Sequence, residues 1–520
     1  MWESVTFPQK KGVDFLDRKK IKSTQIYQEM EPNKAKSWFH FKRSKFIYGV
    51  DTLYCVLYPD CPWPESEQAK RLLDYLDVKK REMEETLEPV PLEQTDLSMK
   101  YGFSFGFYTY HVGINDAWDM FICKKKPNED TPALFLQFRS QYLWTEGVKK
   151  ALYKTIERIE QFLLPFEIKI KDVQENRIDY AFHTNYIQDP VNFFPLKYLR
   201  EMQVSNFSRW HVEGHFYDEI THQDYLTLGR RTSNNVFIRC YNKSKEVVEM
   251  AYKQFFIWIW LLHGLISKYD AYVLEYAYIK KRWHAKEEAR LMFYLDHGSD
   301  HRIKSEINLL LNEKTPYQEL KALADQLLPD LTIITNFEFQ TKRKFYANID
   351  FPIVTECKDH LKRIENIYQL QPEIKNMLTN EVIRFVKYKG KNKQVRRKDR
   401  QTADWWKRLQ ATKVQDLLRE SEYKLIRTYQ RNLDMERQKT LTMHKMATTS
   451  IYLNGMEDTT GIEMNLIQFL STINDNDLHA YQTYKKKKAL ELKRQFEGHQ
   501  KTNHSPRYAL VNKINGETIE

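Results

Sequence analysis

Cysteine is scarce in this chain and follows no metal-binding pattern. There are five cysteines, an odd number, and no two of them form a Cys-x-x-Cys pair. A zinc finger or a framework of disulfide bonds is therefore not expected. The composition fits a protein of a reducing compartment, and we expect it in the cytoplasm.

Long apolar runs and a recognisable signal peptide are also missing. The most apolar stretch, 255–266, is too short to cross a bilayer and is interrupted by His263 and Gly264. We expect this stretch to be a buried helix, and we expect no association with a membrane.

Positive charge and aromatic side chains are abundant by contrast. The 520 residues carry a net charge of +12, and 14% of them are aromatic. Cations neutralise phosphates and rings stack on bases, so this composition favours a nucleic-acid partner. The length allows two or three domains. We divide the chain into an N-terminal arm (1–45), a catalytic domain (46–328), a mainly helical, basic accessory region that binds DNA (329–500) and a disordered tail (501–520).

The pattern of the catalytic region predicts an α+β fold, with antiparallel sheet covered by helices and followed by a mainly helical basic C-terminal region. Short alternating segments linked by turns predict strands at 49–58, 101–111, 118–123 and 133–139. A helix at 65–90 separates the first two. A stripe of apolar residues predicts an amphipathic helix at 149–164 that packs on the sheet.

The segment 227–246 contains the candidate nucleophile. Residues 236–241 alternate as a strand, with Arg239 and Tyr241 on one face, and Lys243 follows within one turn. A tyrosine beside fixed cations suits attack on a phosphodiester, because the cations hold the phosphate and stabilise the charge that builds on it. The alternative is an edge-strand tyrosine among ordinary surface charges.

Two pieces of this segment carry a family resemblance. Gly229-Arg-Arg-Thr-Ser233, followed by Ile238-Arg-Cys-Tyr-Asn-Lys-Ser-Lys-Glu246, resembles the nicking motif of the replication initiation factors of rolling-circle plasmids. Related relaxases of integrative conjugative elements share this motif. The resemblance implies that Tyr241 becomes joined to the 5′ end of a nicked strand and that the protein is a homodimer. We expect DNA contacts from Arg230, Arg231 and Ser233.

A second stretch, 176–185, resembles a conserved strand of the same family. Its alternation puts Arg177, Asp179 and His183 on one face. A carboxylate on a buried strand needs a cation partner, so Asp179 either pairs with Arg177 or binds Mg²⁺ or Mn²⁺. We also expect Arg177 to contact DNA. Many relatives have an aspartate where this chain has His183, which is a second-shell group, a softer ligand that favours Mn²⁺, or a part of the fold.

Two further carboxylates are candidate metal ligands. Asp51 opens the strand 49–58 and is either a cap on the incoming loop or an acid of the site. A long helix is expected at 243–266, and a strand at 269–278 would place Glu275 where the family has its second acid. The rival counterpart, 289–295, has Met292 at that position. Methionine does not bind a hard cation, so we favour Glu275.

The third match, 307–320, resembles the segment that closes the family's catalytic domain and fixes its extent. Beyond it the segment 387–400 is densely basic, with Lys387, Lys389, Arg396 and Arg397. This segment is either a solvated linker or a surface that grips the DNA backbone without reading sequence.

Together these patterns predict a metal-dependent DNA nickase and strand transferase that acts on single-stranded or hairpin origin DNA and works with a host helicase. A relaxase with the same chemistry and an origin-binding protein without nicking activity are the alternatives. The nickase hypothesis requires that the Tyr241 hydroxyl is accessible and lies within ~10 Å of a cluster of acidic side chains, so that a bound ion can reach it.

Overall fold

The fold was obtained as a computed structural model. It describes residues 38–39, 45–101, 107–115, 117–128, 131–188, 190–193, 203–205, 210–217, 220–229, 236–250, 253–312, 315–347, 349, 359–387, 399–414, 417, 435–454, 467, 470–474, 477–483 and 485. The chain divides into two compact units, 1–345 with 351–424, and 346–350 with 425–520.

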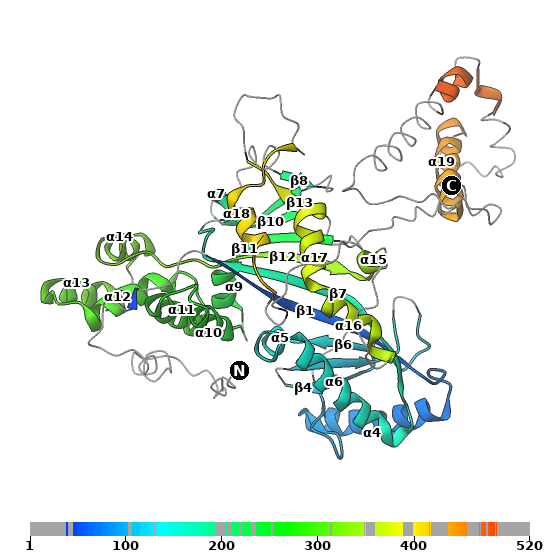
Figure 1. Ribbon diagram of the computed structural model, residues 1–520, viewed down its shortest axis with the longest axis horizontal. Coiled ribbons are helices and arrows are strands. Elements are labelled where there is room, and N and C mark those ends of the chain that lie inside the picture. The colour runs from blue at the N-terminus through cyan, green and yellow to red at the C-terminus, as the bar shows by residue number, and fades with distance from the viewer. Residues whose placement is uncertain are drawn as a thin grey trace. The chain divides into compact units, whose positions relative to one another are not determined.

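An antiparallel sheet of eleven described strands forms the centre of the larger unit (Figure 1). Helices cover it, so the fold class is α+β, as predicted. The strands, in their spatial order, are β2 (Val90–Pro91), β3 (Ser98–Met99), β4 (Tyr110–Ile114), β5 (Trp118–Ile122), β6 (Leu134–Phe138), β1 (Phe46–Pro59), β7 (Ile170–Thr184), β12 (Thr335–Lys342), β11 (Val236–Asn242), β10 (Ile220–Leu228) and β9 (Trp210–Tyr217).

The two longest strands, β1 and β7, run side by side through the middle of the sheet. Their register shifts between Val50 and Thr52, so Asp51 is an extra residue on β1 that has no partner opposite. Such a bulge bends the strand and redirects the side chain at that position. The bulge matters for the site described below.

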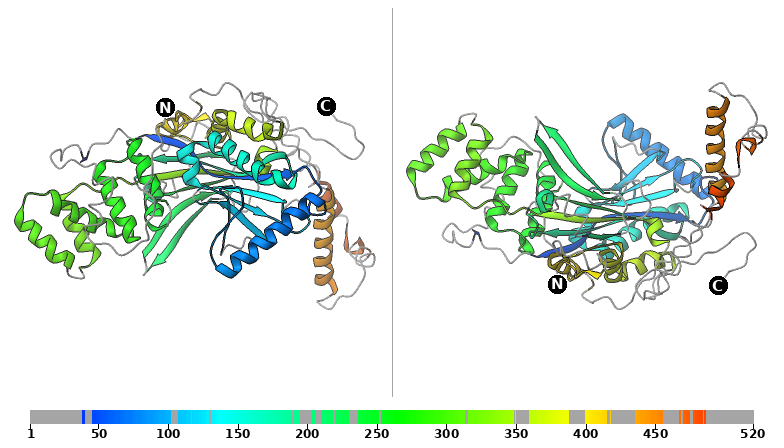
Figure 2. Two further views of the ribbon diagram at one scale, coloured as in Figure 1. Left: turned by 90° about the horizontal axis from the view of Figure 1, so that it is seen from below. Right: turned by 90° about the horizontal axis from the view of Figure 1, so that it is seen from above.

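One face of the sheet is apolar and is covered by helices α6 (Val148–Leu163), α16 (Lys362–Gln369), α17 (Gln371–Met377) and α18 (Asp404–Gln410). Figure 2 shows α6, α16 and α17 on the same side of the sheet. The ring of Trp406 on α18 lies 5.2 Å from that of Phe337 on β12, and Tyr48 on β1 donates a hydrogen bond to Gln371 at 2.9 Å. The predicted apolar stripe of α6 is buried as expected.

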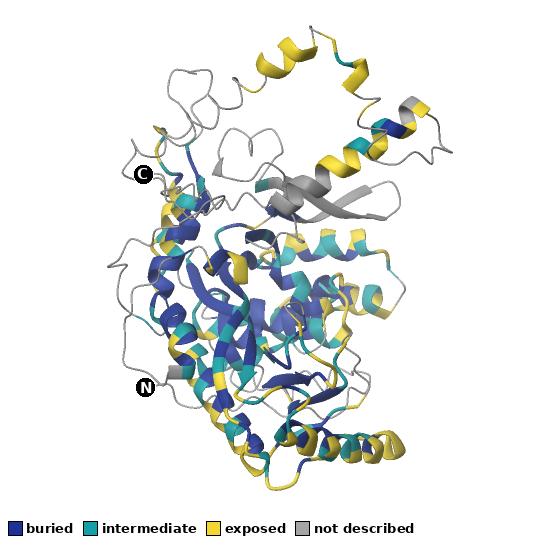
Figure 3. Cartoon of the chain, turned by 90° about the vertical axis from the view of Figure 1, so that its right-hand side faces the viewer, coloured by how far each residue is buried: buried dark blue, intermediate teal, exposed yellow. Residues whose placement is uncertain are grey.

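Helix α4 (Glu67–Thr86) follows β1 and confirms the helix predicted at 65–90. Strands β5 and β6 confirm the predictions at 118–123 and 133–139. Of the strand predicted at 101–111, residues 102–106 lie outside the described residues, and β4 begins at Tyr110. Helix α5 (Ser140–Glu146) comes directly after β6 and packs against β1. Figure 3 shows the buried residues concentrated in the sheet and in the helices against it.

Strands β11 and β12 are neighbours in the sheet, but a helical insertion separates them in the sequence. It contains α9 (Lys243–Glu249), α10 (Phe255–Leu262), α11 (Lys268–Lys280), α12 (Ala285–His297), α13 (His301–Asn312) and α14 (Tyr317–Leu327). The backbone N–H of Lys243 donates to the carbonyl of Ile334 at 2.8 Å, so the two ends of the insertion meet. Trp38, from the predicted N-terminal arm, is buried in the core of this insertion.

Two predictions fail in the insertion. The strand expected at 269–278 is helix α11, and the long helix expected at 243–266 is two short helices, α9 and α10. Nine residues of α11 are buried, around all sides of the helix. A helix that is apolar all round has no amphipathic period, and its tyrosines and valine mimic a strand.

The sheet also continues past residue 328, where we placed the end of the catalytic domain, because β12 lies between β7 and β11. A second sheet pairs β8 (Gln203–Ser205) with β13 (Ile383–Phe385). The smaller unit contains α19 (Met435–Asn454). The predicted tail, 501–520, lies outside the described residues. No described helix has the length and apolarity that crossing a lipid bilayer requires.

Candidate active site

Strands β7, β12 and β11 present a polar cluster on one face of the sheet. Glu338 of β12 lies opposite Ala181 on one side and Arg239 on the other, and Asn336 lies between His183 and Tyr241. Residues directly opposite each other in an antiparallel sheet point to the same face. The register therefore brings Arg239 and Tyr241 together with the polar face of β7. The alternation had predicted the face of each strand, but not that β12 brings the two faces together.

Tyr241 lies inside this polar cluster, which we call the tyrosine cluster. Its hydroxyl donates a hydrogen bond to Glu338 Oε2 at 3.1 Å and accepts one from Asn336 Nδ2 at 3.0 Å; Lys243 Nζ lies 3.4 Å away. The residue is 9% exposed. Burial and the charge of Glu338 raise the pKa of Tyr241 well above its usual value, so the phenol is protonated in this conformation.

This geometry meets one requirement of the nickase hypothesis and fails the other. A carboxylate lies within hydrogen-bond distance of the Tyr241 oxygen, but the hydroxyl is buried rather than accessible. Attack on a phosphodiester therefore needs a second conformation in which the phenol is uncovered.

Arg239, which is partly exposed, forms an ion pair with the buried Glu338 beside the tyrosine. The guanidinium bonds Glu338 Oε1 and lies 5.5 Å from the centre of the Tyr241 ring. Glu338 is 1% exposed, so it requires such a counter-ion. Burial lowers the pKa of Arg239, but the carboxylate of Glu338 outweighs this and the arginine stays charged.

Lys243 lies at the start of α9, where Asn242 caps the helix by accepting a hydrogen bond from the backbone of Lys245. Its side chain is completely buried, with Nζ 3.1 Å from Asp51 Oδ2 and 2.7 Å from Glu246 Oε2. Burial opposes its charge, but these carboxylates raise the pKa of Lys243 well above its usual value. Lys243, which we predicted to hold the phosphate, is thus already paired with two carboxylates.

Asp51 reaches Lys243 because of the bulge in β1. It also accepts hydrogen bonds from Ser140 and from Trp144 Nε1 of α5, the latter at 3.3 Å. Burial raises its pKa, but the charges of Lys243 and Lys253 outweigh burial and hold the pKa well below the usual range. Asp51 is therefore an ionised partner of Lys243. Of the two roles that the sequence allowed, a loop cap and an acid of the site, this is closer to the second.

Asp179 pairs with Arg177, the structural alternative that the sequence allowed. Arg177 bonds both carboxylate oxygens, with Nε 2.9 Å from Oδ1. Burial and then repulsion from Glu338 raise the pKa of Asp179 to about 7, against the effect of Arg177. Two buried carboxylates thus lie close enough to repel each other. Arg177, which we expected to contact DNA, is occupied by this pair.

His183 is a fully buried member of an aromatic stack. Its Nδ1 accepts a hydrogen bond from Trp260 Nε1 at 3.1 Å, and its ring lies parallel to Trp144 at 4.8 Å. Burial, and next the charge of Lys243, lower its pKa to about 3. A neutral ring whose Nδ1 is an acceptor carries its proton on Nε2, which leaves no lone pair there for a metal.

The second acid of the site is Glu338, not Glu275. Glu275 lies on helix α11, where its Oε2 accepts a hydrogen bond from Gln254, and burial raises its pKa to about 7. The alternation of Asn336, Glu338 and Gln340 with phenylalanines and threonine was the signal for the missed strand β12. Strand β12 lies within 329–500, the region that we predicted to be mainly helical.

Most other predicted DNA contacts are not described. Arg230, Arg231, Ser233, Lys389, Arg396 and Arg397 lie outside the described residues. Lys387 is described and pairs with Asp404 at 3.0 Å.

The two neighbouring carboxylates Asp179 and Glu338 suit a hard divalent cation. Mg²⁺ binds oxygen and commonly takes one or two carboxylates together with phosphate oxygens and water. Burial is the main cause of the raised pKa of Asp179, and a cation between the two carboxylates would relieve the repulsion from Glu338 that adds to it. Within the part of the chain that the structure describes, no group of three or more His, Cys, Asp or Glu side chains is arranged to hold a metal ion.

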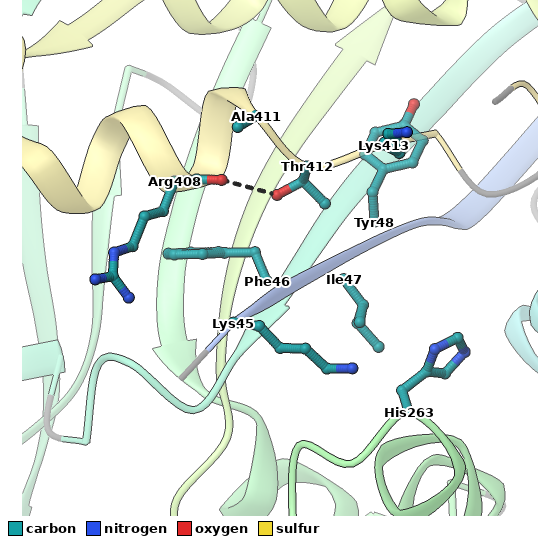
Figure 4. A pocket seen from close by; sticks show the side chains of 9 residues that line it. All are labelled: Lys45, Phe46, Ile47, Tyr48, His263, Arg408, Ala411, Thr412 and Lys413. Carbon is teal, nitrogen blue, oxygen red and sulfur yellow. Dashed lines mark hydrogen bonds between the residues drawn. The ribbon is translucent and has the colours of Figure 1, made fainter. Parts of the chain in front are cut away.

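A basic cavity of about 490 Å³ lies at the start of β1, and no member of the tyrosine cluster lines it (Figure 4). Lys45, His263, Arg408 and Lys413 surround it together with Phe46 and Tyr48. We refer to it below as the basic cavity.

Comparisons with known proteins add little to this geometry. No protein-family model and no curated protein matches the chain. Among solved structures, the chain is similar to the "Structure of Rolling Circle Replication Initiator Protein from Geobacillus stearothermophilus", with 12% sequence identity and a TM-score of 0.33 over 72% of this chain and 99% of that one. A similarity of this level carries no argument about function.

Proposed function

We propose that this protein is a DNA nickase and strand transferase that initiates rolling-circle replication, with Tyr241 as its nucleophile. One observation carries the proposal: the Tyr241 hydroxyl donates to a buried carboxylate, Glu338, while Lys243 lies 3.4 Å from the same oxygen. The carboxylate can take the phenolic proton, and the cation can stabilise the phenolate. The resemblance of residues 229–246 to the nicking motif supports the same chemistry.

The reaction makes one bond and breaks one. The Tyr241 oxygen attacks the phosphorus and passes its proton to Glu338 Oε2. The bond from phosphorus to the 3′ oxygen breaks, and this oxygen takes a proton from water as it leaves, which gives a free 3′-OH. The product is a 5′-phosphotyrosine, whose bond energy allows the reaction to be reversed. Arg239 can turn from Glu338 to the phosphate and hold it.

A divalent cation completes the site in this proposal. Asp179 and Glu338 would hold it, and Mg²⁺ or Mn²⁺ would neutralise charge on the non-bridging phosphate oxygens. The ion would also replace the arginines as the counter-charge of the two carboxylates, which frees Arg177 and Arg239 for DNA.

Substitution of the nucleophile tests the proposal. Wild-type protein should form a covalent adduct with a labelled single-stranded origin oligonucleotide in Mg²⁺ or Mn²⁺, visible on a denaturing gel. Tyr241→Phe should reduce adduct and nicks by roughly 10³-fold or more. Tyr48→Phe is the matched control, because it removes a buried hydroxyl on the opposite face. Nicking that survives in Tyr241→Phe would refute the assignment.

A second function has one observation in its favour. Tyr241 is 9% exposed, and an origin-binding protein that makes no nick would not need to uncover it. Wild-type protein that binds origin DNA but never forms an adduct would establish this alternative. A relaxase of a conjugative element would share the chemistry and differ only in the DNA it recognises.

A further inference from the structure

A group of aromatic side chains lies on the β1–β6–β5 part of the sheet, apart from the main core. Val56, Phe121 and Phe135 are buried, and Tyr54, Tyr58 and Tyr108 pack against them with part of their surface exposed. The rings touch one another: Tyr54 lies 5.7 Å from Phe135, and Tyr108 is stacked at 5.9 Å on the same ring.

This group occupies the same face of the sheet as Tyr241. Tyr54 lies opposite Arg177 in the register of β1 with β7, and the Arg177 guanidinium lies 5.4 Å from the centre of the Tyr54 ring. Arg177 in turn donates a hydrogen bond to Asp179 on the same strand. Tyr54 on β1 and Tyr241 on β11 are three strand spacings apart, or ~14 Å across the sheet. They are also offset along the strands, because Arg177 pairs with Lys342 whereas Tyr241 pairs with Asn336. This offset adds ~20 Å along the strand direction.

Cations flank the aromatic rings. Arg139 bonds the buried Asp119 and is 54% exposed, and Lys100 bonds the same carboxylate at 2.8 Å, so two fixed positive charges face one negative charge. On the other side, Arg343 Nη1 donates to the Tyr58 hydroxyl at 3.1 Å. Rings interleaved with cations are what a single strand of nucleic acid requires, because bases stack on the rings and phosphates pair with the cations.

We infer that this surface, which we call the aromatic platform, binds unpaired bases of single-stranded DNA several nucleotides away from the scissile phosphate. The platform consists of the partly exposed rings of Tyr54, Tyr58 and Tyr108, the buried Phe121 and Phe135 beneath them, and Arg139. The inference rests on the proposed function for the identity of the strand. The platform supplies affinity for the strand without reading its sequence, and the tyrosine cluster supplies the chemistry. A duplex does not fit this surface in the same way, because its bases are already stacked and paired.

Equilibrium binding tests the platform without using the nicking reaction. Fluorescence anisotropy with a labelled single-stranded oligonucleotide should be measured on the full chain carrying Tyr241→Phe, so that no adduct forms. Tyr58→Leu and Arg139→Gln, added singly, should each weaken binding by about tenfold or more. Arg139→Gln should also reduce the slope of log K against log salt by about one. Affinity for the matching duplex should change less than threefold.

Two control variants carry the same loss of charge elsewhere. Lys150→Gln removes a cation that is 60% exposed on α6, and Arg408→Gln removes one from the basic cavity. Both variants should keep the single-strand affinity within about twofold of the parent protein, because neither residue contacts a phosphate if the platform is the binding surface. Arg139→Gln changes an exposed side chain while Asp119 keeps Lys100, so it should fold, and far-UV circular dichroism and urea unfolding verify this.

The outcomes separate the platform from the nickase. Unchanged single-strand binding in folded Arg139→Gln and Tyr58→Leu overturns the platform while adduct formation by wild-type protein still supports the nickase. If Arg408→Gln weakens single-strand binding and the platform variants do not, the platform is overturned and the basic cavity is the binding surface. Weaker binding in both platform variants supports the platform, even if wild-type protein forms no adduct and the proposed nickase activity fails.

Discussion

Glu338 accepts a hydrogen bond from the Tyr241 hydroxyl at 3.1 Å although 97 positions separate the two residues in the sequence. The pair exists because β12 returns to the sheet beside β11 after the helical insertion.

The first prediction compares the carboxylate of Glu338 with that of Glu275, which the sequence favoured. Glu338→Gln should lower adduct formation by about 100-fold or more, because the phenol loses its proton acceptor. Glu275→Gln should leave it within twofold; equal losses in both variants would contradict the assignment of the acid.

The second prediction concerns stability against pH. Burial raises the pKa of Glu275 to about 7 from an ordinary 4.5, so the folded state binds a proton that the unfolded state has released. The stability this proton provides is fully present below pH 4.5 and is lost as the pH rises through about 7. Glu275→Gln should remove that loss and stabilise the protein at pH 8 by roughly 2–3 kcal/mol, with little effect at pH 4.5. Urea unfolding at both pH values measures the difference.

The third prediction tests the buried charges at the start of α9. Lys243→Met should destabilise the protein by about 3 kcal/mol or more, because Asp51 would lose its ion-pair partner and Glu246 would keep only Lys253. The double variant Lys243→Met with Asp51→Asn should recover part of this loss. Chemical unfolding of the single and double variants gives the coupling free energy, and a loss below about 1 kcal/mol in Lys243→Met would argue against the ion pairs.

The fourth prediction concerns the divalent cation. Mn²⁺ should raise the midpoint of thermal unfolding of wild-type protein, since an ion that binds only the folded state stabilises it. Asp179→Asn should abolish this rise. Asp51→Asn should retain the rise in the unfolding midpoint, because Asp51 pairs with Lys243 and is not a ligand of the ion in this proposal. A rise that depends on Asp51 and not on Asp179 would assign the ligands differently.

The fifth prediction is spectroscopic. The hydrogen bond from Trp260 should fix His183 as the neutral tautomer protonated at Nε2, with a pKa near 3. ¹⁵N-resolved NMR of the histidine rings should show one ring that keeps this pattern between pH 5 and 8. The ¹⁵N chemical shifts of this ring should stay the same when diamagnetic Mg²⁺ is added. The shifts of a histidine that binds the ion directly would change.

The alternation of strands β7 and β11 was sufficient to predict which side chains share the polar face. Arg177 and Asp179 on one strand, and Arg239 and Tyr241 on the other, point as the period of two requires. These strands pack one face on the core, so the pattern is visible in the sequence. Asp51 differs, because the bulge that turns it towards Lys243 depends on the register of β1 with β7, and a single strand does not reveal its partner.

Helix α11 shows where the pattern misled us. Tyrosines and a valine suggested a strand at 269–278, whereas Ser267 and Asp270 form a capping box that marks the start of a helix. The cap was readable in the sequence and should have outweighed propensity. Glu338 was missed for a different reason: it becomes a neighbour of Tyr241 only through a pairing across the whole insertion, which no local pattern records.

The closed stem of the insertion has a consequence for how this protein can vary. Lys243 and Ile334 are hydrogen-bonded, so the inserted helices leave and re-enter the sheet at one point. For such a closed loop, each doubling of length costs only about 0.6 kcal/mol of closure free energy. Homologous chains could therefore lengthen, shorten or exchange this appendage while the strands that bear Tyr241 and Glu338 keep their alignment.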